Sequence, residues 1–229
     1  RLEKRKSKLN KFLKNLNKIE FVVTNACTGR CKHCSEGDHT SCGEHIDPAV
    51  AADAVKKITA AYPIKTVMTF GGEPLLYPET VYAVMKTASE LNIPKRQIIT
   101  NGYFSKDAVR RLAESGVNDL RLSADAFHQE YIPLEPIKIF AEEAKAAGIP
   151  IRIQPAWLVS RDDRNEYNIR TKQIWSNIYD ENQKSYKNVL NWRKNQYGLL
   201  ILQYYKGRYS IQKGIRGRAL LCFLRYCSP

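Results

Sequence analysis

The chain has 229 residues, of which 43% are hydrophobic, and its formal net charge is +14. This length suits one domain with or without an appendage, and the sequence lacks the run of about eighteen apolar residues that a membrane-spanning helix needs. Six cysteines, three of them within eight residues, favour metal ligation in a reducing, cytoplasmic compartment over a disulfide framework.

The positive charge is concentrated at the two ends of the chain. Residues 1–18 carry +7 and residues 182–229 carry +10, whereas residues 19–181 carry −3. Within residues 1–18 the apolar side chains fall at helical spacing between lysines, which predicts a basic amphipathic helix packed on the domain. Contact of its lysine face with a membrane surface or an acidic partner is the alternative interpretation.

Residues 19–170 alternate between β-rich and helical patterns. Asp47 followed by Pro48 is typical of a helix start, and Gly148 is typical of a helix end. In chain order we expect strands at 19–24, 65–70, 96–100, 119–123 and 151–158, and helices at 48–61, 79–91, 105–116 and 135–147. This alternation predicts an α/β fold with parallel strands and a ligand site beyond their carboxyl ends.

The first candidate site is the loop that contains Cys27, Cys31 and Cys34, with the spacing C-x3-C-x2-C. Thiolates are the ligands of iron–sulfur clusters. Three thiolates can hold three irons of a 4Fe–4S cluster and leave the fourth iron open to a small molecule. A structural zinc site, completed by His33 or His39, is the alternative interpretation of the same loop.

The second candidate site is the element Gly71-Gly72-Glu73-Pro74, directly after the strand predicted at 65–70. Paired glycines at a strand end let the backbone approach a ligand closely. The carboxylate that follows supplies charge, and the proline stiffens the exit of the turn. A zinc site has no use for this element, so its presence disfavours the zinc interpretation.

Together, the cysteine triplet and the GGEP element resemble the radical S-adenosylmethionine (radical SAM) superfamily. The resemblance implies a partial (β/α)6 barrel with helices outside and a cluster on the three cysteines. The open iron would bind the amino and carboxylate groups of S-adenosylmethionine, and Gly71, Gly72, Glu73 and Pro74 would contact its amino group. Reductive cleavage of this cofactor would give a 5′-deoxyadenosyl radical that abstracts hydrogen from a substrate. His33 occupies a position that is usually aromatic and keeps a flat ring there.

Two further motifs resemble the peptide- and protein-modifying, SPASM-type members of the superfamily. Asn101 lies in the run ITNG, although Asn-Gly is also a common plain turn. Ser123 and Asp125 form an S-x-D motif, which the resemblance places near the ribose and methionyl parts of the cofactor. In the family a glycine usually follows this aspartate, where this chain has Ala126.

Three polar residues near the predicted strand ends carry less specific signals. His128 is interpreted as a structural histidine with a satisfied hydrogen bond, and a proton donor or substrate contact is the alternative. Arg152 and Gln154 share one face of their strand by alternation and could reach into the barrel toward a carboxylate.

The C-terminal segment, residues 171–229, is basic and rich in tyrosine, and residues 199–205 form a candidate last strand. Nucleic-acid binding is not expected, because no binding motif accompanies the tyrosines. Cys222 and Cys227 are too few for a complete auxiliary-cluster domain, so at most a remnant of one is predicted, and Cys42 is interpreted as an ordinary thiol.

The resemblance implies a peptide or protein substrate, such as a ribosomally made peptide. A small-molecule substrate and a cluster-binding protein without turnover are the alternatives. The basic ends suit an acidic electron donor of the flavodoxin or ferredoxin type, because complementary charge speeds encounter.

Overall fold

The computed structural model describes residues 16–34, 43–104, 106–178, 198–205, 208–215 and 218–223, the last three segments by their backbone. Within these segments, none of the helices combines the length and apolar content needed to cross a bilayer.

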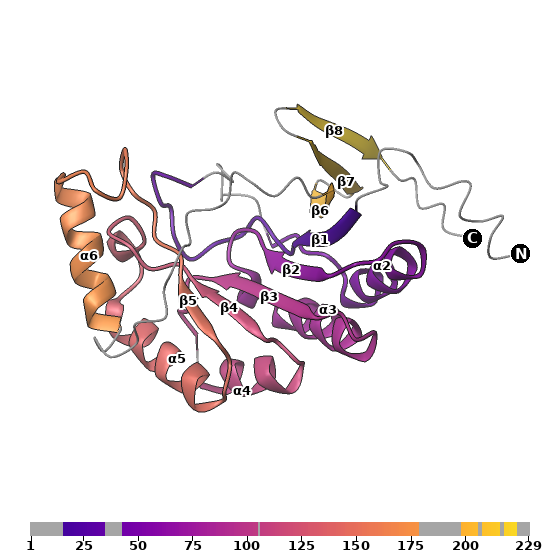
Figure 1. Cartoon of the computed structure of the whole chain (residues 1–229), viewed down its shortest axis with the longest axis horizontal. Helices are drawn as coiled ribbons and strands as arrows, with labels where there is room; N and C mark the ends of the chain where they lie inside the picture. Colours follow the sequence, from indigo (N-terminus) through magenta and orange to yellow (C-terminus); the bar gives the residue numbers. More distant parts are fainter. Residues whose placement is uncertain are drawn as a thin grey trace, which may run out of the picture.

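The described fold is a parallel sheet with helices on one face. Its first five strands are β1 (Leu16–Val22), β2 (Thr66–Phe70), β3 (Lys95–Thr100), β4 (Asp119–Leu122) and β5 (Ile151–Ile153), which pair in that order. Helices α2 (Pro48–Ala61), α3 (Pro78–Glu90), α4 (Lys106–Glu114) and α5 (Leu134–Ala146) connect them and cover the same side of the sheet (Figure 1). The predicted α/β fold with parallel strands is confirmed.

The core lies between the sheet and these helices. Alternate residues of each strand point toward the helices, because side chains in a strand alternate between faces. The largest fully buried side chains are Phe21, Phe140, Leu16, Ile19, Ile46, Met85, Ile93, Ile98, Leu112, Leu120, Leu122 and Ile132. At the start of α2, the Asp47 carboxylate accepts hydrogen bonds from the N–H groups of Ala49 and Val50, as the sequence predicted for a cap. The opposite face of the sheet is therefore left free of these helices.

The chain continues past β5 into helix α6 (Glu166–Ile178) and three further strands. Strand β6 (Gly198–Tyr205) pairs parallel with β1, and β7 (Arg208–Ile215) and β8 (Arg218–Phe223) add to it antiparallel. The strand predicted at 199–205 is present, and it lies beside β1 at the edge opposite β5. Strands β7 and β8 were not predicted; Cys222 falls in β8, and Cys227 lies outside the described residues.

Most boundaries agree with the prediction to within two residues, and two differ by more. The helix predicted at 1–18 cannot include residues 16–18, which form the start of β1, where the side chain of Leu16 is buried and Lys18 pairs with Thr66. The remainder of that helix and the predicted cap Ser105 lie outside the described residues. Strand β5 ends at Ile153 instead of residue 158, because Pro155 has no N–H group for the ladder.

Candidate functional site

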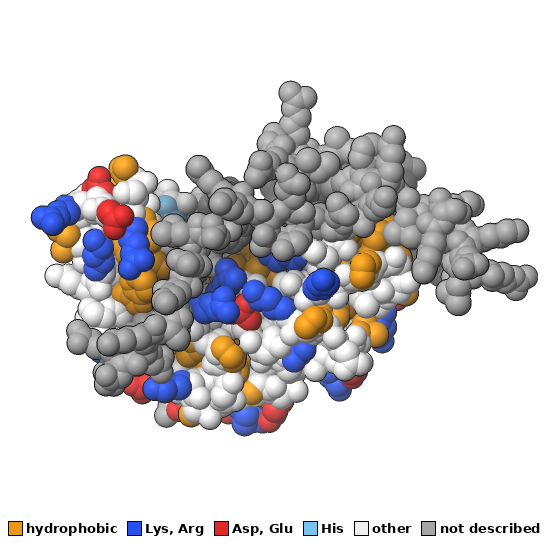
Figure 2. Space-filling model, in the orientation of Figure 1, with side chains coloured by type: hydrophobic (Ala, Val, Ile, Leu, Met, Phe, Trp, Pro, Cys, Tyr) orange, Lys and Arg blue, Asp and Glu red, His pale blue; other side chains and the backbone are white. Residues whose placement is uncertain are grey.

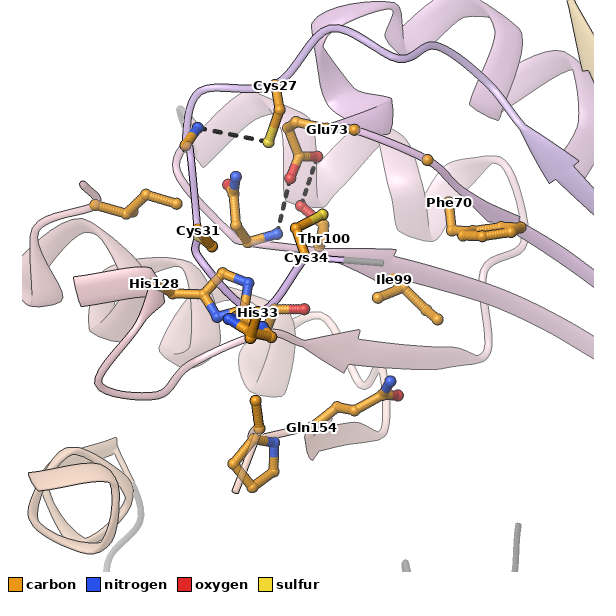
Figure 3. A pocket seen from close by; sticks show the side chains of 18 of the residues that line it. Cys27, Cys31, His33, Cys34, Phe70, Glu73, Ile99, Thr100, His128 and Gln154 are labelled. Carbon is orange, nitrogen blue, oxygen red and sulfur yellow. Dashed lines mark hydrogen bonds between the residues drawn. The ribbon is translucent and has the colours of Figure 1, made fainter. Parts of the chain in front are cut away.

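The carboxyl ends of β1 to β5 surround a cavity of about 570 Å³. Eight of the predicted site residues line it: Cys27, Cys31, Cys34, Gly71, Gly72, Glu73, Asn101 and Ser123. His33, His128 and Gln154 line it too, and Gln154 lies across the cavity from Cys27 (Figure 3). Pro74 and Asp125 are not among the lining residues. The strand ends thus bring together most of the residues that the two motifs predicted.

The cysteine loop is folded back on itself by its own backbone. The N–H of Cys34 donates to the carbonyl of Cys31 at 3.0 Å, and the Arg30 guanidinium donates to the carbonyls of Cys27 at 3.1 Å and Gly29 at 3.0 Å. A β-carbon on Gly29 would lie only 3.2 Å from the Cys31 sulfur, so a larger residue there would crowd the thiol. This geometry turns three half-buried thiols toward one cavity.

Burial favours the neutral form of two of these thiols, Cys27 and Cys31. It raises the pKa of Cys27, and it raises the pKa of Cys31 to about 12, with smaller contributions from the negative charges of Asp125, Cys27 and Cys34. Thiolate is the form that binds metals, and a bound cation favours it. The donor set therefore fits a thiolate-ligated iron–sulfur cluster, whose iron ions would stabilise the thiolate form.

The ring of His33 packs among aromatic side chains beside the cysteine loop. Its centroid lies 4.7 Å from that of Phe127 and 5.0 Å from that of His128. Burial lowers the pKa of His33, which favours the neutral imidazole. The prediction of a flat ring at this position agrees with its packing, whereas His39, the other zinc ligand considered, lies outside the described residues.

The two glycines of the GGEP element hold it against the start of the cysteine loop. The N–H of Gly72 donates to the carbonyl of Thr24 at 2.7 Å, and the N–H of Glu73 donates to the carbonyl of Ala26 at 2.8 Å. A β-carbon on Gly72 would lie 2.1 Å from the Ala26 oxygen, and Gly71 adopts a φ of +134°. Glycine is required at both positions because the two loops approach so closely.

The carboxylate of Glu73 ties this element to the end of β3. One oxygen accepts from the hydroxyl of Thr100 at 2.8 Å and the N–H of Leu75 at 3.0 Å, and the other accepts from the N–H of Asn101 at 2.8 Å (Figure 3). Burial raises the pKa of Glu73 to about 7, although these hydrogen bonds oppose the shift. Pro74 begins the short helix η2 (Pro74–Leu76), which fixes the exit of the turn.

Asn101 connects three segments of the site. Its side-chain amide donates to the hydroxyl of Thr28 in the cysteine loop at 2.8 Å, and its carbonyl oxygen accepts from the N–H of Tyr103 at 3.1 Å. The following Gly102 has a φ of +72°, a turn conformation that suits glycine. Asn101 thus forms a turn and also links β3 to the cysteine loop.

Asp125 lies fully buried behind the cavity wall. Its Oδ1 accepts from the N–H groups of Phe127 and His128 at 2.9 and 3.0 Å, and its Oδ2 accepts from the N–H of Ala156 at 2.8 Å. Burial raises its pKa, but the hydrogen bond and charge of His128 together with the backbone donors outweigh this and lower the pKa below its ordinary value. These contacts leave Asp125 little capacity to face a ligand directly.

What Asp125 holds in place is His128. The Nδ1 of His128 lies 2.9 Å from Asp125 Oδ2, and the ring lines the cavity. Ligand atoms of His33, Asp125 and His128 lie within 4.8 Å of one another, a spacing that a metal ion could use. The oxygens of Asp125 are already engaged by backbone N–H groups and by His128, so this carboxylate positions the His128 ring, which in turn packs edge-on against the ring of His33.

The sequence did not single out Thr28, Thr100 or Arg121. Thr28 and Thr100 connect the motifs to each other. In the sequence, Thr100 could be noticed only as part of the run ITNG. Arg121 could have been found by alternation, because it lies between Asp119 and Ser123 at every second position of the predicted strand and so shares their face.

A family model described as the radical SAM superfamily matches residues 21–153. Among curated proteins, the chain is 27% identical over 125 residues to a GTP 3′,8-cyclase of Clostridium perfringens, an alignment of 53% of this chain and 38% of the relative. It is 26% identical over 121 residues to the GTP 3′,8-cyclase of Chlorobaculum tepidum, covering 53% and 36% of the two chains. The alignments thus span well under half of these relatives.

Two solved structures share the fold. Streptococcus suis SuiB bound to the precursor peptide SuiA is 19% identical, with a TM-score of 0.60 over 77% of this chain and 40% of SuiB. The anSMEcpe protein with bound AdoMet is 16% identical, with a TM-score of 0.54 over 71% of this chain and 48% of that one. At these identities the similarity concerns the fold alone.

Proposed function

Because the chain belongs to the radical SAM superfamily, whose members are enzymes, we propose that it binds a 4Fe–4S cluster and cleaves S-adenosylmethionine reductively. The observation that carries the proposal is that three thiols of one loop and the GGE turn open into a single cavity at the carboxyl ends of parallel strands. Ligands bind at this end of βα folds.

Cys27, Cys31 and Cys34 are the proposed ligands of the cluster. When bound, the cluster would supply one electron for the reductive cleavage of S-adenosylmethionine to methionine and a 5′-deoxyadenosyl radical, which would abstract hydrogen from the substrate. The protein binds and orients the cofactor and the substrate, and it excludes water from the site. His33, packed against Phe127, closes one wall of the cavity beside the cysteine loop.

The cofactor residues are proposed from the cavity wall. The backbone of Gly71 and Gly72 and the carboxylate of Glu73 would receive the amino group, because an ammonium beside Glu73 stabilises the ionised form that burial disfavours. Asn101 and Ser123 line the same cavity and offer polar groups to the rest of the cofactor. Pro74 and Asp125 would act indirectly, by fixing the GGE turn and the ring of His128.

For the substrate, we propose a peptide or protein. The fold is shared with SuiB, whose structure contains a precursor peptide, and the S-x-D and ITNG motifs resemble those of peptide-modifying members. The second candidate is a small molecule, which the similarity to GTP 3′,8-cyclases favours. For the electron donor, we propose an acidic flavodoxin or ferredoxin.

The test is anaerobic reconstitution of the full chain with iron and sulfide. We expect a brown protein with about four irons per chain that releases 5′-deoxyadenosine when given S-adenosylmethionine and dithionite. Cys31→Ala should lose both the colour and the release, whereas Cys42→Ala, at the expected ordinary thiol, should keep both.

Each other outcome identifies an alternative. A brown protein that releases no 5′-deoxyadenosine would indicate a cluster-binding protein without turnover. A colourless protein with bound zinc would support the structural-zinc interpretation, and undiminished release by Cys31→Ala would contradict the cluster assignment.

A further inference from the structure

The floor of the cavity is the helix-free face of the sheet. Asp119, Arg121 and Ser123 point to one side of β4 by alternation, and Ser123 lines the cavity. In the register of the sheet, Arg121 is the partner of Ile99, which also lines the cavity, and of Arg152 on β5. Two arginines therefore lie side by side on neighbouring strands at the margin of the cavity.

Positive charge exceeds negative charge in this part of the floor. The side chain of Asp119 is only 5% exposed, and three cations share its carboxylate: Lys95 at 2.9 Å, Arg152 at 3.8 Å and Arg121 at 4.0 Å. Near its middle, the view in Figure 2 shows lysine and arginine side chains gathered around an acidic one. One carboxylate cannot neutralise three cations, so this cluster has a surplus of two positive charges.

The nearby acid Glu20 attracts Arg121 but does not remove the surplus, because its charge is balanced by a lysine. Glu20, which lines the cavity, already forms an ion pair with Lys18. The Arg121 side chain is 16% exposed, and its buried Nε has no hydrogen-bond partner in the described part of the chain. Its other contact is a long one, 3.4 Å from Nη1 to the Oε1 of Gln154 at the cavity wall. A buried cation with unused donors is costly unless a ligand completes it.

We propose that Arg121 and Arg152, which lie at the margin of the cavity next to its lining residues Ile99 and Gln154, bind an oxyanion of the substrate, a carboxylate or a phosphate. Guanidinium groups match both oxyanions through paired, charge-assisted hydrogen bonds. Asp119 holds the two guanidinium groups side by side, and Gln154 borders the site. The inference rests on the proposed function, since it assigns the charged end of the substrate to the side of the cavity opposite Cys27.

The experiment is calorimetric titration of pyrophosphate and of glutarate into the cluster-reconstituted full chain, without S-adenosylmethionine. We expect one of the two probes to bind, and the tighter probe identifies the oxyanion. Arg152→Gln and Arg121→Gln should each weaken binding about tenfold or more, as for the loss of a charge-assisted hydrogen bond. Arg110→Gln, at an exposed arginine that pairs with Glu114 on α4, is the matched control and should bind like the wild type.

A variant that should tighten binding distinguishes an effect of charge from damage to packing. Glu20→Gln removes a negative charge from the cavity wall and should tighten binding, whereas damage to packing would weaken it. Arg152 is 51% exposed, so its variant tests the site even if loss of Arg121 impairs folding. The inference is overturned if neither probe binds, or if the Arg152 variant binds like the Arg110 control. Release of 5′-deoxyadenosine, measured on the same samples, tests the proposed function separately.

Discussion

Glu73 lies buried at the cavity wall with a pKa of about 7, against an ordinary value of 4.5. Between these two values the folded chain keeps a proton that the unfolded chain releases. Stability therefore falls as pH rises from 4.5 to 7, because the folded state binds more protons. The shift corresponds to about 3 kcal/mol once both states are ionised.

We expect this effect in the melting temperature of the cofactor-free chain between pH 5 and pH 8. Glu73→Gln removes the titrating group and should flatten the decline that the wild type shows. Glu79→Gln, at an exposed carboxylate on α3 that pairs with Arg111, should leave the decline unchanged. Parallel curves for the wild type and the Glu73 variant would show that the carboxylate does not carry the raised pKa.

At this scale the sequence predicted the site where the signal was local. The cysteine spacing and the paired glycines can be recognised within a short stretch of sequence, and those residues line the cavity. The environment of Asp125 was not predictable, because its partners include the N–H of Ala156, 31 residues away and beyond the end of β5. Such a contact depends on how separate loops meet.

Helix α6 holds the loop that follows β5. Asn168 is fully buried in this helix, and its side-chain oxygen accepts from the N–H of Leu158 at 2.9 Å. Its amide nitrogen donates to the carbonyls of Leu158, Ser160 and Asp163, at 3.1, 2.7 and 3.0 Å. The loop also contains Val159, 87% exposed with a φ of +69°, a conformation that β-branched residues rarely adopt. The hydrogen bonds of Asn168 therefore help to hold this loop in a conformation that is unfavourable at Val159.

Asn168→Ala should release this loop, because the bonds from Asn168 to three of its carbonyls and to one of its N–H groups are lost together. We expect a loss of about 1–3 kcal/mol in stability and faster amide hydrogen exchange in residues 158–163. Asn177→Ala, on the same helix, removes an exposed bond to the Gln173 carbonyl and serves as the control. Equal exchange in the two variants would contradict the role of Asn168.

The alternation of strands and helices was predicted well, because each element carries its own periodicity and caps. The start of β1 was not predicted, because lysines beside apolar residues also fit a helix. Only the pairing with β2 and β6 makes residues 16–18 a strand. The pairing of β6 with β1 joins residues about 180 positions apart. No local pattern specifies such a contact.

For the whole molecule, the charge at the two ends of the chain bears on the encounter with the proposed electron donor. The chain carries +14, with the excess in residues 1–18 and 182–229. If the donor is an acidic flavodoxin or ferredoxin, attraction between opposite charges should speed reduction of the cluster at low salt. Salt screens charges over about 10 Å at 0.1 M, so reduction should slow steeply with ionic strength.

Stopped-flow reduction at increasing potassium chloride measures this dependence. Dithionite, a small reductant that needs no docking surface, provides the comparison, and its rate should depend less on salt. A donor rate that stays flat across the salt series would remove the role assigned to the basic ends.

The strand order has a consequence for self-association. Because β6 lies beside β1, the edge strand at the other side of the described sheet is β5, which has three residues and ends before Pro155. Open margins of sheets can recruit strands from other molecules, and short length, charge and proline discourage this. Arg152 in the strand and Pro155 after it give this edge all three features, so a residue beside the cavity and one that lines it also discourage edge-to-edge pairing at β5.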